Sequence, residues 1–200
     1  MLRFFSTCVL LAAGLILISC RSAVAAAPLA DSMTGSSLGM LFSMCDDHFH
    51  KGEYCHSVRL SKIVIQGNPW NMDAYANSAW LLWSMNRDPE AVELLEEGSK
   101  ANPATYYMYD ELGVYYAVRK KDYVRSIDWY KKATACKDCP ALTYHGMAHS
   151  YEKNGQLAKA VETWNIAVNM KNNMNAEIAR INLERVKKLL ETAPIEKPKE

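Results

Sequence analysis

Residues 112–133 decide the fold, and they read LGVYYAVRKKDYVRSIDWYKKA. Small residues, Gly113 and Ser126, alternate with large aromatic ones at helical spacing on both sides of a polar turn. This alternation predicts two helices whose axes approach closely, because a small residue on one helix leaves room for the other. Two Asn-Pro pairs, beginning at Asn68 and Asn102, lie 34 residues apart, and each follows a helical apolar pattern. The chain is therefore predicted to repeat one helix hairpin at that period.

The same alternation recurs in three other segments, with decreasing clarity. The fourth copy follows Tyr151 with a Gly155 turn, and the first has Gly52-Glu53-Tyr54 at its turn and Pro69 at its close. The second copy diverges most at its turn, residues 86–90. The positions predicted to allow close packing are Ala79, Ala91, Gly113, Ser126, Ala148 and Ala160, and those predicted to fill the space between hairpins are Tyr116, Tyr130, Tyr151 and Trp164.

This pattern resembles the tetratricopeptide repeat family, with one residue inserted in the turn of the third copy. The resemblance implies an all-α, right-handed α-solenoid of four hairpins, at about 38–71, 72–105, 106–140 and 141–174. A further helix over 175–192 is predicted to cap the array, with Ile178, Ile181, Val186, Leu189 and Leu190 on its apolar side. The amino end has no obvious cap, so Met40, Leu41 and Met44 are expected to be partly exposed or covered by another chain.

The two ends of the chain differ from the repeats. Residues 1–20 have the pattern of an export signal, with Arg3 before an apolar run, and the ending Leu17-Ile18-Ser19-Cys20 resembles a bacterial lipobox that would be lipidated at Cys20. Cleavage within residues 23–27, which would release a soluble protein, and an uncleaved anchor are the alternatives. Residues 21–37 are predicted to be a flexible tether and residues 193–200 a disordered tail.

Composition excludes several classes of function. Lysine and arginine number 23 against 22 acids, so charge alone would not hold the chain on nucleic acid. No phosphate loop, paired-carboxylate motif or nucleophile-and-base arrangement occurs in a suitable context, so we predict no enzyme activity and no cofactor. A metal site at His145, His149 and Glu152, which share one face of a predicted helix, is a minor alternative. The cluster Asp46 to His50 points to different helix faces and is predicted to be a solvated helix end.

Four cysteines remain beyond the signal and Cys20, an even set that suits an oxidising compartment. Cys136 and Cys139 form a CxxC after the second helix of a hairpin, where the helix dipole disfavours a thiolate. We therefore predict a local disulfide there rather than a redox, haem or zinc site. A second bridge between Cys45 and Cys55, which flank the first turn, is a weaker prediction.

In the family that the chain resembles, the first helix of each repeat lines a concave groove that binds a partner. Matching positions here give an aromatic, mildly acidic groove suited to an extended or helical apolar segment carrying a basic residue. Its residues are Phe42, Asp46, Phe49, His50, Asp73, Ala76, Trp80, Trp83, Tyr107, Asp110, Val114, Leu142, His145, His149 and Glu152. For Trp80 and Trp83, packing on neighbouring helices is an equal alternative.

The predicted function is thus a protein-binding module of the cell envelope or periplasm, attached to a membrane only through its lipid. Self-association through the uncapped amino end is the second hypothesis, and metal handling the third.

Overall fold

The computed structural model describes residues 31–171 and 173–192, and all the regular elements in those ranges are helices. The predicted all-α fold is therefore confirmed. The predicted signal peptide with Cys20, residues 21–30 of the predicted tether and the predicted tail at 193–200 lie outside the described residues. Among the described residues, no helix has both the length and the apolar character needed to pass through a membrane. The chain divides into two compact units, residues 1–68 and 69–200.

The described part of the first unit is a helix hairpin. A helix over residues 31–50 packs against α2, Tyr54–Gly67, and Gly52 at the turn has a φ of +74°, a conformation that glycine adopts without strain. Ser61 Oγ donates a 3.3 Å hydrogen bond to Cys45 Sγ across the two helices. At the open end, a β-carbon on Gly67 would lie 2.7 Å from Leu38 Cδ2. The hairpin is held by close contact along its length.

The first helix begins earlier than predicted. Residues 31–37 are helical, so the prediction that they belong to a flexible tether is wrong. Their small polar side chains are satisfied within the helix, because Ser36 Oγ and Ser37 Oγ each donate a 2.9 Å bond to the carbonyl four residues earlier. No proline interrupts this stretch, so a helix is compatible with its composition. Met40 and Met44 are exposed, as expected.

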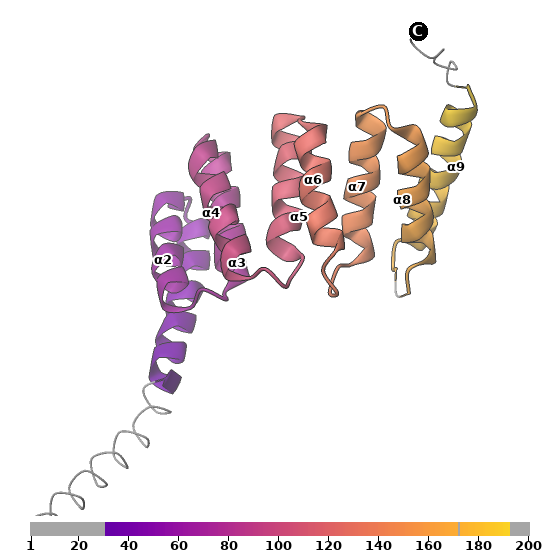
Figure 1. The fold of residues 1–200 in the computed structure, drawn as a ribbon. Coiled ribbons are helices and arrows are strands. Elements are labelled where there is room, and N and C mark those ends of the chain that lie inside the picture. The colour runs from indigo at the N-terminus through magenta and orange to yellow at the C-terminus, as the bar shows by residue number, and fades with distance from the viewer. Residues whose placement is uncertain (1–30, 172, 193–200) are drawn as a thin grey trace, which may run out of the picture. The chain divides into compact units, whose positions relative to one another are not determined.

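The second unit is a row of antiparallel helix pairs followed by a single helix (Figure 1). Its elements are α3 (Met72–Ser84), α4 (Asp88–Ala101), α5 (Tyr107–Val114), η1 (Tyr115–Lys120), α6 (Tyr123–Thr134), α7 (Ala141–Lys153), α8 (Leu157–Asn169) and α9 (Ala176–Thr192). Local signals begin several of them. Asn71 accepts a bond from the amide of Ala74, Asp122 accepts one from Arg125, and Pro89 stands in the first turn of α4. The first helices of the pairs adjoin, α5 with both α3 and α7.

The predicted packing of small against large residues is confirmed. All six small positions and all four aromatic positions of the prediction are buried. Tyr130 shows the constraint most clearly, since a β-carbon on Gly113 would lie 2.7 Å from its ring and one on Gly146 would lie 2.5 Å from its hydroxyl oxygen. One aromatic side chain therefore fixes the spacing of α5, α6 and α7.

The residue inserted in the third copy is not in the turn, where it was predicted. The end of the first helix instead widens into the π-helical segment η1, which accommodates extra length without breaking the helix. Lys121 then adopts a left-handed conformation with a φ of +54°, and the amide of Asp122 donates to the Tyr116 carbonyl. The turn into α6 keeps a compact, hydrogen-bonded form.

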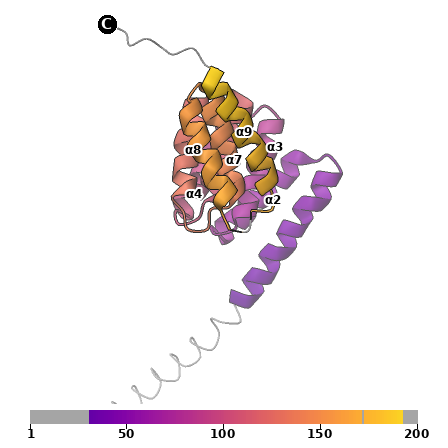
Figure 2. The same cartoon turned by 90° about the vertical axis from the view of Figure 1, so that its right-hand side faces the viewer.

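Helix α9 packs on the last pair, as the predicted cap would, but with a different face (Figure 2). Ala179, Leu183 and Val186 are buried, and they join a core with Trp164. Of the residues predicted for the apolar side, only Val186 is buried; Ile178, Ile181, Leu189 and Leu190 are exposed. The prediction failed because the helix uses small Ala179 to approach α8 closely and turns its larger apolar residues outward.

Candidate functional site

The candidate site lies on the first helices of the pairs in the second unit. The most exposed part of the site is on α3. Asp73 is exposed and Trp80 is 49% exposed, whereas Ala76 is buried and so offers little contact. Trp83 is half-buried and lies 5.7 Å from the ring of Tyr115, centre to centre. The two tryptophans therefore differ in exposure: Trp83 packs against Tyr115, and Trp80 is half exposed to solvent.

Helix α5 carries the chemically distinctive part of the site, two adjacent acids beside aromatic rings. Burial raises the pKa of Asp110, and burial followed by the charge of Asp110 raises the pKa of Glu111 to about 7. Burial, and then the nearby Glu111 and Asp73, raise the pKa of Tyr107 to about 12. No lysine or arginine in the described part of the chain forms an ion pair with Asp110 or Glu111. A half-buried acidic pair without a cation costs free energy, which a cationic ligand would relieve.

Sequence reasoning placed Asp110 in the groove but missed Glu111. The family register assigns groove positions at fixed offsets, and Glu111 is one residue beyond such an offset. The available signal was chemical: two consecutive acids in a helix otherwise rich in tyrosine. Val114, the other predicted α5 position, is half-buried and packs against the core of the later helices.

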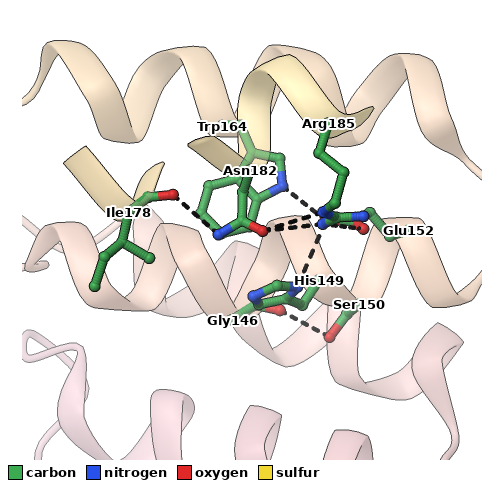
Figure 3. Close-up of polar contacts among 8 residues, drawn as sticks. All are labelled: Gly146, His149, Ser150, Glu152, Trp164, Ile178, Asn182 and Arg185. Atoms are coloured by element: carbon green, nitrogen blue, oxygen red, sulfur yellow. Dashed lines mark hydrogen bonds and ion pairs between the residues drawn. The ribbon is translucent and has the colours of Figure 1, made fainter. Parts of the chain in front are cut away.

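Helix α7 differs from the prediction, because its polar residues serve the fold (Figure 3). Glu152 accepts a 2.8 Å bond from Trp164 Nε1 on α8 and a 2.7 Å bond from Arg185 Nη2 on α9. His149 Nδ1 lies 3.5 Å from the same carboxylate. Burial alone would raise the pKa of Glu152, but these three partners together lower it to about 2. Glu152 thus joins three helices and is not free to bind a partner.

The two histidines of α7 both pack against Trp164. His145 is buried with its ring centre 5.0 Å from that of Trp164, and His149 is edge-on to the same ring at 4.8 Å. Burial, and next the charge of His149, lower the pKa of His145. With the Glu152 oxygens already bonded, the three residues do not offer a metal three available ligand atoms. Of the predicted α7 groove positions, exposed Leu142 and the edge of His149 remain accessible.

The predicted groove positions of the first unit lie on its helix over 31–50. Asp46 and His50 are exposed and 3.5 Å apart, between Oδ1 and Nε2. Phe42 and Phe49 are half-buried, and Phe49 lies 5.7 Å from the ring of Tyr54 at the start of α2. These residues form a surface of the first hairpin.

The predicted disulfides are not formed, since none of Cys45, Cys55, Cys136 and Cys139 is in a disulfide bond. Cys136 Sγ bonds the Lys132 carbonyl at 3.5 Å, and Cys139 Sγ the Pro140 carbonyl at 3.6 Å, so each thiol is directed to a different acceptor. Burial raises the pKa of both thiols, that of Cys139 to about 11, so the fold favours the protonated form of each.

Hydrogen bonds hold the loop between α6 and α7 without a disulfide, and the first hairpin is also held without one. Asp138, between the two cysteines, accepts bonds from Thr105 Oγ1 and the Tyr106 amide at 2.6 and 3.1 Å. In the first hairpin, buried Cys45 faces Ser61, which lies about 9 Å further along α2 than exposed Cys55. That separation explains why Cys45 and Cys55 do not meet.

Solved structures share this arrangement of helices. The crystal structure of PilW, a widely conserved type IV pilus biogenesis factor, matches with a TM-score of 0.59 and 15% identity over 76% of this chain and 70% of that one. The crystal structure of MamA protein matches with a TM-score of 0.56 and 18% identity over 78% of this chain and 90% of that one. Both contain tetratricopeptide repeats. No protein-family model and no curated protein matches the sequence.

Proposed function

Because this chain has the tetratricopeptide-type solenoid fold of PilW and MamA, we propose that it is a non-enzymatic module that binds a segment of another protein. The binding surface is the face made by α3, α5 and α7. The observation that carries the proposal is the half-buried pair Asp110 and Glu111, beside Tyr107 and without a lysine or arginine partner in the described residues. Such a pair suits a lysine or arginine presented by an apolar partner segment.

The energetics favour this kind of ligand over a neutral one. A cation against Glu111 would return the pKa of that carboxyl toward its ordinary value of 4.5, so binding would release a proton. Trp80 and Leu142, exposed at the neighbouring helices, supply apolar area on either side. Large aromatic contact with one buried charge pair is the usual composition of a binding hot spot.

The proposal is tested by crosslinked recovery of partners from the cell envelope with single-site variants. Glu111→Gln and Trp80→Ala should each abolish recovery of a partner that the unchanged chain retains, while the circular dichroism of both variants stays helical. Glu162→Gln, on an exposed position of α8, is the matched control and should retain the partner. Equal recovery with all four proteins would refute the assignment of this face.

We also propose that the module is exported and held at a membrane by lipid on Cys20, as an assembly or scaffold factor of the envelope. The support is the signal-like pattern of residues 1–20, and the alternative is cleavage within 23–27 with release of a soluble protein. Labelled palmitate should be incorporated into the chain in its own cells and lost in Cys20→Ala. Incorporation that survives the substitution, or none at all, would contradict lipidation.

Self-association is the second candidate function, and exposed apolar side chains favour it. Met40 is 69% exposed on the first helix, and Ile178 and Ile181 are 53% and 61% exposed on α9. Stacking of a second copy on either surface would remove them from water. Sedimentation across a wide concentration range tests this, and a monomer throughout would dismiss it.

A further inference from the structure

The turn of the first hairpin brings together two histidines and a glutamate. His48 Nδ1 lies 2.5 Å from Glu53 Oε2, and His56 Nδ1 lies 3.9 Å from the same oxygen. One ligand atom from each residue falls within 4.8 Å of the other two, and the two imidazole rings are 5.5 Å apart between centres. These residues come from the end of one helix, the turn and the start of the next, so the folded turn is what gathers them.

The main chain fixes the three residues relative to one another. The Glu53 amide donates a 2.8 Å bond to the His48 carbonyl, and the His56 amide donates a 2.9 Å bond to the Glu53 carbonyl. The preceding Gly52, at a φ of +74°, donates to the Phe49 carbonyl at 2.9 Å and closes the turn. The backbone of Glu53 is therefore hydrogen-bonded to the backbones of both histidines. Because this part of the main chain is already ordered, a ligand would lose little affinity to the cost of ordering it.

The Glu53 side chain does not perform the role that its position would suggest. It is the N-cap residue of α2, yet its carboxylate makes no capping bond to the helix amides. It is directed to His48 and His56 instead. All three side chains keep access to solvent, 27%, 45% and 59% exposed for His48, Glu53 and His56, so an ion can reach them.

We propose that His48, Glu53 and His56 form a binding site for a divalent transition-metal ion of the zinc type. Two imidazole nitrogens and one carboxylate oxygen suit zinc, nickel or copper, whereas calcium and magnesium require oxygen ligands. Three protein ligands leave a coordination position for water. The site is distinct from the α3, α5 and α7 face and belongs to the first unit alone.

The distances need only small changes to hold such an ion. Metal–ligand bonds of about 2.0–2.2 Å in a tetrahedral site place neighbouring ligand atoms about 3.3 Å apart. The His48 and Glu53 atoms would separate from 2.5 Å and the His56 and Glu53 atoms would approach from 3.9 Å, each by less than about 1 Å, and the ligand nitrogens of the two histidines, which lie within 4.8 Å of each other, would approach by up to about 1.5 Å. Rotation of exposed side chains achieves this without movement of the turn.

Calorimetric titration of the full chain with zinc ion, in the absence of chelators, tests the proposal. We expect one ion per chain and an increase in the melting temperature of the first hairpin with zinc concentration. His56→Ala and Glu53→Gln should each weaken binding at least about tenfold, because removal of one of three ligands leaves an incomplete set. His56 is exposed, so its loss should leave helical content unchanged.

Three controls identify the ligands. His50→Ala removes an exposed histidine two residues from His48 that pairs with Asp46, and it should bind zinc as the unchanged chain does. Cys55→Ser tests whether the neighbouring thiol is a ligand, and His149→Ala tests α7; both should also bind normally. Unchanged affinity in His56→Ala and Glu53→Gln, or an equal loss in His50→Ala, Cys55→Ser or His149→Ala, would overturn the assignment.

Discussion

Glu111 should make the free protein less stable at neutral pH than it would be with a neutral residue there. The folded-state pKa of about 7 exceeds the ordinary value of 4.5, so the unfolded chain gives up this proton at lower pH than the folded one. Below about pH 4.5 the group is protonated in both states and contributes nothing. As the pH rises from about 4.5 to about 7, the unfolded chain loses this proton before the folded chain does, so the free energy of unfolding falls. One pKa unit corresponds to about 1.4 kcal/mol, so the penalty has an upper limit of about 3 kcal/mol, and partial exposure of the side chain reduces it to about 1–2.

Glu111→Gln removes the titrating group while nearly preserving its volume. Urea unfolding followed by circular dichroism should show the variant about 1–2 kcal/mol more stable than the unchanged chain near pH 8, and equally stable near pH 4.5. Glu162→Gln, exposed on α8, should show no pH-dependent gain. A gain of the same size at both pH values would mean that packing, not the unpaired charge, is responsible. No gain at pH 8 would refute the argument that the fold destabilises the charged form of Glu111, a cost that a cationic ligand would relieve.

Three other substitutions test the forces that hold the second unit. Asp88→Asn should lower stability by about 1–2 kcal/mol at neutral pH, because the Asp88 pKa is lowered chiefly by a hydrogen bond from Arg119. That stability is present above the ordinary carboxyl pKa of 3.8 and is lost only as the pH falls far below it, so the difference in urea unfolding should begin to shrink below about pH 4 and should still be largely present at pH 3. Glu152→Gln should destabilise by about 1–3 kcal/mol at pH 7, and the difference should shrink in acid between about 4.5 and 2, as measured by urea unfolding at each pH. Gly113→Ala should destabilise the protein by about 1–3 kcal/mol in thermal melts, because its new β-carbon would lie 2.7 Å from the Tyr130 ring. Gly39→Ala is the control, and because there is open space around Gly39 this substitution should be neutral or stabilising.

The repeat pattern predicted most of the fold because it records packing directly. A neighbouring helix can approach closely only where the residues are small, as at Gly113 and Ser126, and both are buried as that reasoning requires. The same reasoning failed where the pattern does not record packing. Residues 31–37 have no apolar period, yet they are helical, and Ser36 and Ser37 bond carbonyls of the same helix.

The candidate site was predicted only in part, for two physical reasons. Family register locates a helix face but not the polar partners on the next helix, so Glu152 was predicted to face a ligand although Trp164 and Arg185 bind it. Reasoning one helix at a time also treated His48 as part of a solvated helix end. Its partners, Glu53 and His56, meet it only after the turn is closed by Gly52. Contacts that depend on a turn have no period in the sequence.

The π-helical segment η1 affects how the array can change in length. An additional residue in a linking turn would displace the helices that follow it, whereas η1 takes up the extra length within the helix that carries it. Its last residues, Arg119 and Lys120, reach back to Asp88 at the start of α4. Deleting one residue from 115–120 would therefore restore the common period and at the same time displace Arg119 and Lys120 from Asp88, so a shorter chain would be more regular but would lose these ion pairs between successive helix pairs.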